Sequence, residues 1–258
     1  MRFDEDLTAC AALVQRADPD RFMAAMAAPV AARRLLFPLY ALNVEVARAP
    51  WAASEPMLAE MRLQWWRDAL AGIATDKGAR RHEVVTPLAQ VISAAQAAEL
   101  DEMINVRRWD IYKDPFDDLA HFNRYIDQSS GPLMWVAAQV LGPADQDVVR
   151  DFAYASGLAG FLRAVPDLRA RGRVPLPDDT PEAIRALASD GLARLARARS
   201  QRAQVSRAAS AALLVGWQAE TVLKQALRDP GRVAVGTLGQ GEVGRRLSLM
   251  RRVVTGRW

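Results

Sequence analysis

This 258-residue sequence contains two pairs of aspartates that could bind a divalent metal ion, and the members of each pair are four residues apart. Asp114 and Asp118 form one pair, and Asp147 and Asp151 form the other. On a helix this spacing places both carboxylates on one face, where they can share a magnesium ion. Each pair also lies near a predicted helix start, where aspartate caps free N–H groups and complements the helix dipole. We therefore predict capping residues here rather than metal ligands.

Cysteine and histidine are too scarce to build a typical metal site. The one cysteine, Cys10, excludes an internal disulfide framework and argues against a cysteine-based zinc site. The two histidines are His82 and His121, and the segment His82-Glu-Val-Val-Thr86 lacks the second histidine of a zinc-protease motif. From these residues we predict no metal site and no cofactor.

The segment Gly239-Gln-Gly-Glu-Val-Gly244 fits the G-x-G-x-x-G fingerprint of dinucleotide-binding proteins. That fingerprint works inside a strand–helix–strand unit with an acidic residue about 20 positions further on. Only 14 residues follow Gly244, and none of them is acidic. We therefore interpret the segment as a glycine-rich turn before a last helix.

The spacing of apolar residues predicts helices throughout the chain. Alanine, leucine and arginine, which favour helices, are frequent, whereas alternating β-type runs are scarce. The expected helices begin near Pro29, at Ser54, near Leu119, at Asp145 and at Thr180, with the last one running toward Arg228. No internal repeat or linker divides the chain. We expect one all-α domain, residues 1–258, with roughly eight to ten helices in a bundle.

Two of these helices have apolar sides that indicate what they bury. The helix capped by Ser54, with Pro56 in its first turn, is expected to bury Leu58, Met61, Trp65 and Trp66. The helix near Leu119 carries apolar or small residues at steps of three and four, namely Phe122, Ile126, Ser130, Leu133, Ala137 and Val140. The segment Ser129-Ser-Gly-Pro132 predicts an interruption of this helix and a close approach of its neighbour.

The net charge of +4 is unevenly distributed. Residues 191–258 contain 13 Lys or Arg and 3 Asp or Glu, a net charge of +10, so residues 1–190 carry −6. Such a basic segment either binds an anionic partner, such as a membrane surface, or is a solvated surface. Its last helix, over residues 245–254 with Trp258 beyond, either anchors at a membrane interface or packs on the bundle. No helix-turn-helix or zinc framework is present, so we predict no nucleic-acid partner.

The sequence contains no recognisable targeting or membrane-spanning signal. Asp4, Glu5 and Asp6 are unlike a signal or transit peptide. No apolar stretch approaches the roughly 20 residues that cross a bilayer. We expect a cytoplasmic protein whose contact with the inner membrane is peripheral.

Four segments together resemble the squalene/phytoene synthase family. They are residues 33–42 (Arg-Arg-Leu-Leu-Phe-Pro-Leu-Tyr-Ala-Leu), 61–70 (Met-Arg-Leu-Gln-Trp-Trp-Arg-Asp-Ala-Leu), 107–110 (Arg-Arg-Trp-Asp) and 161–177, which begins Phe-Leu-Arg-Ala-Val-Pro. Their order and spacing match the family over nearly the whole chain. The resemblance implies an isoprenoid synthase-type fold, which is an all-α helical bundle with a central cavity.

The resemblance also implies where carboxylates should stand. In this family two aspartate-rich motifs bind the Mg²⁺ ions that hold the substrate diphosphate. The positions that correspond to them here are Ala47 and Trp51, and Ala164 and Leu168, and none is a carboxylate. The resemblance therefore implies no catalytic residues and a narrower, more apolar cavity than in an active synthase. The candidate ligand-binding residues are Arg33, Tyr40, Asn43, Arg163 and Arg173.

These departures are similar to one non-catalytic branch of the family, which acts in the assembly of mitochondrial complex I. The similar segments are Leu42-Asn-Val-Glu-Val-Ala47 and Leu162-Arg-Ala-Val-Pro166. The resemblance implies a pseudoenzyme that helps assemble NADH:quinone oxidoreductase, with complex I subunits or other membrane proteins as partners. Two alternatives stay open. One is an active synthase that condenses farnesyl or geranylgeranyl diphosphate, and the other is a non-catalytic isoprenoid- or lipid-binding protein.

Overall fold

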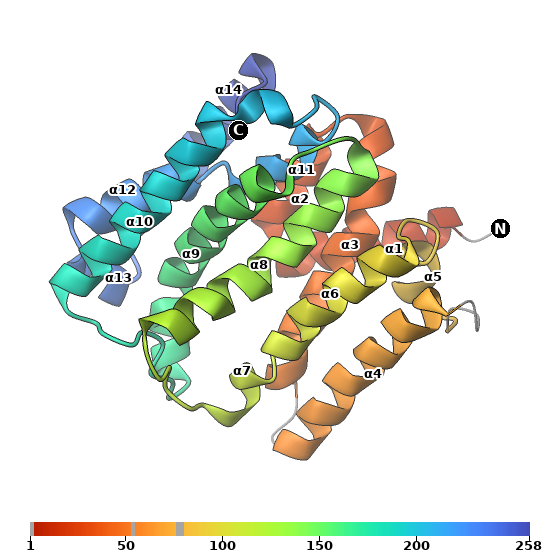
Figure 1. Ribbon diagram of the computed structural model, residues 1–258, viewed down its shortest axis with the longest axis horizontal. Helices are drawn as coiled ribbons and strands as arrows, with labels where there is room; N and C mark the ends of the chain where they lie inside the picture. Colours follow the sequence, from red (N-terminus) through yellow and green to blue (C-terminus); the bar gives the residue numbers. More distant parts are fainter. Residues whose placement is uncertain (1–2, 53–54, 76–79) are drawn as a thin grey trace.

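The computed structural model describes residues 3–52, 55–75 and 80–258, and these are helical with no β-strand (Figure 1). The α-helices are α1 (Phe3–Ala17), α2 (Pro19–Ala27), α3 (Val30–Arg48), α4 (Pro56–Ala74), α5 (Val85–Leu88), α6 (Ala94–Val106), α7 (Trp109–Tyr112), α8 (Leu119–Leu141), α9 (Gln146–Ala170), α10 (Pro181–Ser200), α11 (Ser210–Leu213), α12 (Ala219–Arg228), α13 (Gly231–Ala234) and α14 (Glu242–Thr255). Three short 3₁₀ helices are η1 (Ala49–Trp51), η2 (Arg202–Gln204) and η3 (Leu214–Gly216). The predicted all-α fold is confirmed.

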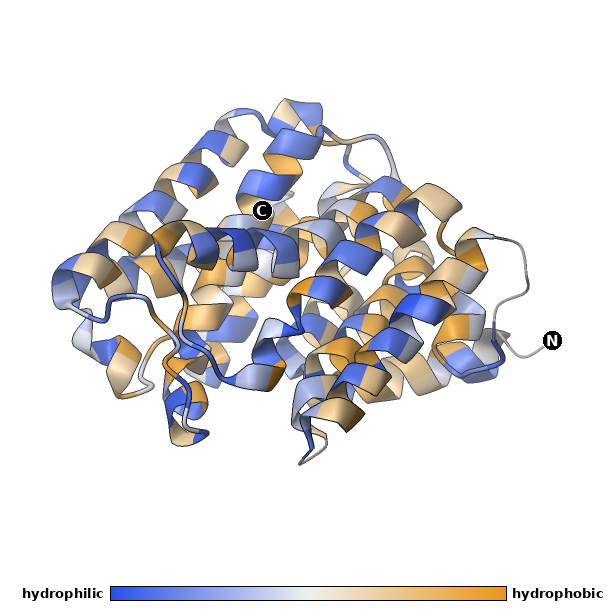
Figure 2. Cartoon of the chain, turned by 60° about the horizontal axis from the view of Figure 1, so that its bottom comes forward, coloured by the Kyte–Doolittle hydropathy of each residue, from blue (hydrophilic) through white to orange (hydrophobic). Residues whose placement is uncertain are grey.

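The long helices pack in a row. Each of α4, α6, α8, α9, α10 and α12 contacts the next in that order, while α3 packs against α8 and α1 against α3 (Figure 1). Many of the helices have one hydrophobic and one hydrophilic side (Figure 2). The hydrophobic sides meet in one continuous buried core, in which Leu63, Phe122 and Trp217 are almost inaccessible to solvent.

Small residues bring α8 and α9 close together at the middle of the bundle. A Cβ atom placed on Gly157 of α9 would lie 2.7 Å from the Cβ of Ser130 in α8, so a larger residue would push the helices apart. The predicted close approach is therefore observed, but the predicted interruption is not. Helix α8 continues through Pro132 because buried apolar residues on both sides of it outweigh one missing backbone hydrogen bond.

Helix starts follow the predicted capping chemistry. The side chains of Asp118, Asp145 and Thr180 each accept a hydrogen bond from the backbone N–H three residues further on, at the starts of α8, α9 and α10. Pro56 occupies the first turn of α4 as expected. The predicted cap of that helix, Ser54, lies outside the described residues.

Helix α4 buries Trp66 and partly buries Trp65 as predicted, but Leu58 and Met61 of the predicted side are exposed. Leu58 and Met61 are 46% and 62% exposed, whereas Leu63 and Trp66 are buried. The helix stands at one end of the row and is covered by α6 on one side (Figure 1). The positions of the neighbours α6, η1 and α7 therefore decide which apolar residues are covered, and the spacing of apolar residues alone gave only part of the buried side.

The single long helix predicted from Thr180 to Arg228 is wrong. Helix α10 ends at Ser200, and two 3₁₀ turns and α11 precede α12. Backbone hydrogen bonds from Asp145 N–H to the Gln204 carbonyl (3.0 Å) and from Ser206 N–H to the Pro143 carbonyl (2.9 Å) hold the chain against the α8–α9 turn. This pairing turns the chain back, so that α12 packs against α10.

The single cysteine is part of the core. Cys10 of α1 has no exposed surface, and its thiol donates to the Glu83 carbonyl at 3.4 Å. Burial raises the pKa of the Cys10 thiol to about 12, so the thiol stays protonated at neutral pH.

Three cations surround Glu220 of α12 and connect that helix with α10 and α14. The distances to the Glu220 carboxylate are 2.6 Å from Arg199, 2.7 Å from Lys224 and 3.3 Å from Arg252. Burial alone would raise the pKa of Glu220, but hydrogen bonds from Lys224 and Arg199 lower it to about 2. Ionised Glu220 therefore stabilises the folded chain.

The substitution Glu220→Gln tests this contribution. The folded pKa lies below the ordinary value of 4.5, so the stabilisation is present above that pH and is lost as the pH falls toward 2. We expect the variant to lose about 1–2 kcal/mol of unfolding free energy at neutral pH, a figure reduced for solvent screening because Glu220 is 29% exposed.

Urea unfolding over this pH range measures the effect. The difference between wild type and variant should narrow as the pH falls from about 5 to about 2. Glu242→Gln, at a carboxylate that is 67% exposed and paired with Arg246, is the control and should have little effect. If the difference in unfolding free energy between wild type and Glu220→Gln did not change with pH, Glu220 would not be the stabilising ionised group.

Candidate functional site

A cavity of about 340 Å³ lies among α3, α8 and α9. Four of the residues that line it are Ala47 of α3, Trp51 of η1, and Ala164 and Leu168 of α9. These are the four positions at which the family resemblance places carboxylates. The fold therefore brings together residues that are far apart in the sequence, and their side chains give this part of the wall an apolar character.

Tyr40 and Asn43, two of the candidate ligand-binding residues, line the same cavity from α3. Tyr40 is 1% exposed, and its hydroxyl has no hydrogen-bond partner. Burial raises the pKa of this phenol, so the hydroxyl is neutral and can donate. A buried polar group without a partner is costly, which makes the Tyr40 hydroxyl a candidate contact for a polar ligand atom.

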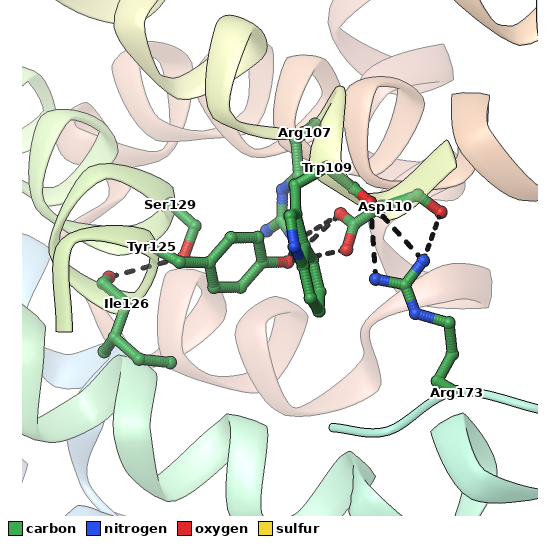
Figure 3. Close-up of polar contacts among 7 residues, drawn as sticks. All are labelled: Arg107, Trp109, Asp110, Tyr125, Ile126, Ser129 and Arg173. Atoms are coloured by element: carbon green, nitrogen blue, oxygen red, sulfur yellow. Dashed lines mark hydrogen bonds and ion pairs between the residues drawn. The ribbon is translucent and has the colours of Figure 1, made fainter. Parts of the chain in front are cut away.

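A buried polar network lies at the cavity wall near α7 (Figure 3). Asp110 of α7 is 5% exposed, and the Tyr125 hydroxyl of α8 donates to its two oxygens at 2.9 and 3.1 Å. The Arg107 guanidinium donates to the same hydroxyl at 2.8 Å and to Asp110 at 3.3 Å. The charge of the Asp110 carboxylate is thus balanced by Arg107, and its oxygens accept hydrogen bonds from Arg107 and Tyr125.

The ionisation states of this network follow from its contacts. Burial alone would lower the pKa of Arg107, but Tyr125 and Asp110 leave it above its ordinary value. Burial raises the pKa of Tyr125. Arg107 is therefore charged and Tyr125 neutral, with the Tyr125 hydroxyl hydrogen directed to Asp110 and the Arg107 guanidinium at the cavity wall.

Arg173 holds the outer side of the same network (Figure 3). It is 4% exposed, donates to the Asp110 carbonyl at 2.9 Å and lies 4.0 Å from the centre of the Trp109 ring. Gly172, with a φ of 76°, allows the loop after α9 to turn so that this contact forms. Burial lowers the pKa of Arg173, an effect that Asp110 offsets in part. Arg173 therefore fixes α7 instead of lining the cavity.

The other two candidate ligand-binding residues lie away from the cavity. Arg33 donates to the Met26 carbonyl at 2.7 Å and lines a separate surface groove. Arg163 lies on an exposed side of α9 and pairs with Asp20 at 3.1 Å. The structure therefore groups Tyr40 and Asn43 in one place, with Arg173 nearby, but does not bring Arg33 and Arg163 to them.

Sequence reasoning gave no role to Arg21 or Tyr125, which both line the cavity. Arg21 of α2 lies 5.1 Å from the centre of the Tyr40 ring, and Tyr125 organises the network around Asp110. Tyr125 directly precedes Ile126 in the predicted apolar stripe of α8, and a buried tyrosine needs a partner for its hydroxyl. That rule, applied together with the segment Arg107-Arg-Trp-Asp110, could have identified the contact.

One member of each spaced aspartate pair has the role predicted for a helix start, and the prediction is wrong for Asp114 and Asp151. Asp118 caps α8, and Asp147 lies in the first turn of α9. Asp114 is exposed in a loop, and Asp151 pairs with Arg197 at 2.6 Å. Over residues 3–52, 55–75 and 80–258, no group of three or more His, Cys, Asp or Glu side chains is arranged to hold a metal ion.

For Trp258 in the basic segment, the structure shows the second of the two predicted alternatives, which is packing on the bundle. Trp258 is 5% exposed, its ring lies 5.0 Å from that of Phe152, and Arg199 donates to its carbonyl at 2.9 Å. The indole therefore packs in the core, because contact with Phe152 removes it from water. In the part of the chain that the structure describes, no helix is long and apolar enough to cross a bilayer.

The network around Asp110 gives a stability prediction. Asp110→Asn leaves the Arg107 guanidinium without its counter-charge, and Arg107 is only 20% exposed, so we expect a loss of about 3 kcal/mol of unfolding free energy. Tyr125→Phe removes one hydroxyl and should cost about 1–2 kcal/mol. Urea unfolding measures both.

Asp114→Asn is the matched control for this measurement. Asp114 is exposed in the loop that follows α7, so its substitution should change the unfolding free energy by less than about 0.5 kcal/mol. Equal stabilities of the Asp110 and Asp114 variants would refute the structural role of the network.

Curated relatives carry the name of an assembly factor. The chain is 24% identical over 185 residues to NADH dehydrogenase (ubiquinone) complex I, assembly factor 6, of Bos taurus and 23% identical over 175 residues to that of Homo sapiens. It is 25% identical over 175 residues to the homolog of Drosophila melanogaster. These matches cover 64–66% of this chain and 52% of each relative, so the chain spans about half the length of those proteins.

Solved structures of synthases share the fold. A dehydrosqualene synthase in complex with ligand superposes with a TM-score of 0.75 at 13% identity, covering 99% of this chain and 97% of that one. A squalene synthase from Alicyclobacillus acidocaldarius gives 0.74 at 15% identity, covering 88% and 95%. The sequence model of the squalene/phytoene synthase family matches residues 14–245. The chain belongs to the squalene/phytoene synthase family.

Proposed function

We propose that this chain is a non-catalytic member of its family that helps assemble respiratory complex I, NADH:quinone oxidoreductase. The observation that carries the proposal is the cavity wall formed by Ala47, Trp51, Ala164 and Leu168. Ionisation of an allylic diphosphate needs metal ions to neutralise the leaving group, and these side chains offer no ligands for them. Asp110, the one carboxylate among the described residues of the wall, is already bonded to Arg107 and Tyr125.

The names of the relatives support the assembly role. Complex I subunits or other membrane proteins are the partners in this proposal, and the inner membrane is the place of action. Residues 1–258 act as one domain, and the basic segment 191–258 makes a peripheral membrane contact. A net charge of +10 on that segment supports attraction to an anionic surface.

The cavity is proposed to hold an isoprenoid or a similar lipid. Ile126, Leu133 and Met134 supply apolar wall, and Tyr40 and Asn43 supply groups that can bind a polar end of the ligand. A volume of about 340 Å³ lies in the range of small-molecule sites. Such a ligand is compatible with an assembly role, because a bound lipid can stabilise the fold without being converted.

A second candidate function is catalysis by an active synthase. Arg21 and Arg107 line the cavity, and guanidinium groups bind phosphate, so a diphosphate could be held without the missing carboxylates. Incubation of the purified chain with Mg²⁺ and farnesyl or geranylgeranyl diphosphate distinguishes the two functions. We expect no release of pyrophosphate above background, and clear turnover would exclude the non-catalytic proposal.

Deletion of the gene tests the assembly role. We expect membrane NADH:quinone oxidoreductase activity and the amount of assembled complex I to fall together, and the wild-type gene to restore both. Succinate:quinone activity in the same membranes is the control and should not change. Normal NADH:quinone activity with a fully assembled complex would overturn the proposal.

A Tyr40→Phe variant tests the cavity ligand. The substitution removes the unpartnered hydroxyl but keeps the ring, so we expect unchanged or slightly higher stability. Mass spectrometry of lipid that co-purifies with the protein should show less ligand in the variant than in wild type. Equal amounts in both would show that this hydroxyl does not contact a ligand.

A further inference from the structure

The outward side of α14 carries a row of exposed apolar residues. Val243, Leu247, Met250 and Val254, here called the α14 stripe, are 73%, 56%, 59% and 81% exposed. Their spacing of four, three and four residues places them on one face of the helix. Leu249, on another face, is 7% exposed, and α14 contacts α2 and η3. The helix is therefore fixed to the bundle by one side and presents a separate apolar side to the surroundings.

Two arginines flank the α14 stripe. With 3.6 residues per turn, Arg246 and Arg251 fall on opposite sides of it, and both are exposed. Arg246 pairs with Glu242 at the surface, where such a pair contributes little to stability. By contrast, Arg245 and Arg252 turn inward, to Asp20 and Glu220. The apolar surface is thus bordered by cations on both sides.

The α14 stripe leads into a basic groove at Val254. This groove of about 720 Å³ lies between the end of α14, the α2–α3 junction and the segment from η2 to α11. Arg33, Arg202, Arg207 and Arg257 line it together with Arg252, whose guanidinium pairs with Glu220, and no acidic residue is among its described lining. Val30, on the wall formed by the α2–α3 junction, is 70% exposed. Apolar and cationic surface are therefore continuous from the helix to the groove.

We propose that the α14 stripe and this groove dock on a bilayer that contains anionic phospholipids. The apolar side chains enter the boundary of the acyl chains, and the arginines contact lipid phosphates. This inference rests on the peripheral membrane contact in the proposed function and names the element that makes it.

The charge pattern favours a bilayer over other occupants. A second copy of this chain would bring the same arginines to the contact, and like charges would repel. The arginines extend from α14 to the α2–α3 junction, which matches a surface of many phosphates better than a single ion. An amphipathic cationic helix with valine, leucine and methionine on its free side has the composition of an interfacial helix.

Partition into vesicles tests the proposal with the purified full chain. We expect binding to phosphatidylcholine vesicles that contain phosphatidylglycerol, and much weaker binding to phosphatidylcholine alone. Arg246→Gln with Arg251→Gln should reduce the partition coefficient by about fivefold for each arginine. Leu247→Ser with Met250→Ser should reduce it by about tenfold or more through lost apolar burial.

Matched variants on exposed surfaces elsewhere are the controls. Met57→Ser with Met61→Ser removes two exposed methionines of α4, and Arg62→Gln with Arg185→Gln removes two exposed arginines. Both pairs should retain wild-type binding. Circular dichroism and thermal unfolding check that all four double variants remain folded, as expected for exposed positions.

Three outcomes would overturn the proposal. The first is equal loss of binding in the α14 variants and their controls. The second is release from vesicles by inorganic phosphate but not by chloride at the same ionic strength, which would assign the groove to free phosphate. The third is a dimer that becomes monomeric in the Leu247/Met250 variant, which would assign the α14 stripe to a second copy. The vesicle assay contains only this chain and lipid, so it tests the membrane surface independently of the assembly role. Loss of vesicle binding and failure of gene complementation can therefore be observed separately.

Discussion

A carboxylate buried as deeply as that of Asp110 is stable only while donors surround it, because its removal from water costs several kcal/mol. Arg107 and Tyr125 supply the donors to the side chain, and Arg173 holds the backbone of the same segment. These four residues come from the end of α6, α7, α8 and the loop after α9. One electrostatic requirement therefore fixes the relative positions of four segments, and with them one end of the cavity.

The rest of the cavity depends on how closely α8 and α9 approach. Gly157 against Ser130 sets that distance, and the short side chains of both leave space between the helices and α3. The solved synthases share the overall fold at 13% and 15% identity, so the fold persists although most residues differ. In this chain the cavity presents Ala47, Trp51, Ala164 and Leu168 on its wall, with Tyr40 and Arg107 as donors. This part of the wall therefore places hydrogen-bond donors beside an apolar surface.

Much of the fold was predictable from local signals. Aspartate and threonine caps at Asp118, Asp145 and Thr180 define helix starts because they act on backbone groups within one turn. The exposed side of α4 and the turn after Ser200 depend on neighbours distant in the sequence, and the spacing of apolar residues carries no information about them. The same division holds at the cavity. The family motifs located Tyr40 and the four wall residues. The contact of Tyr125 with Asp110, and the position of Arg33 outside the cavity, depend on the tertiary structure and could not be read from the motifs.

The burial of Cys10 means that its reactivity reports local unfolding of α1. A thiol with a pKa of about 12 and no exposed surface reacts with alkylating reagents only when α1 separates from the core. Since the chain has one cysteine, the labelling rate of wild-type protein reports a single local event without any engineered probe. Helix α1 packs on α3, which carries Tyr40. A ligand that binds in the cavity and stabilises the folded state would therefore slow the alkylation of Cys10.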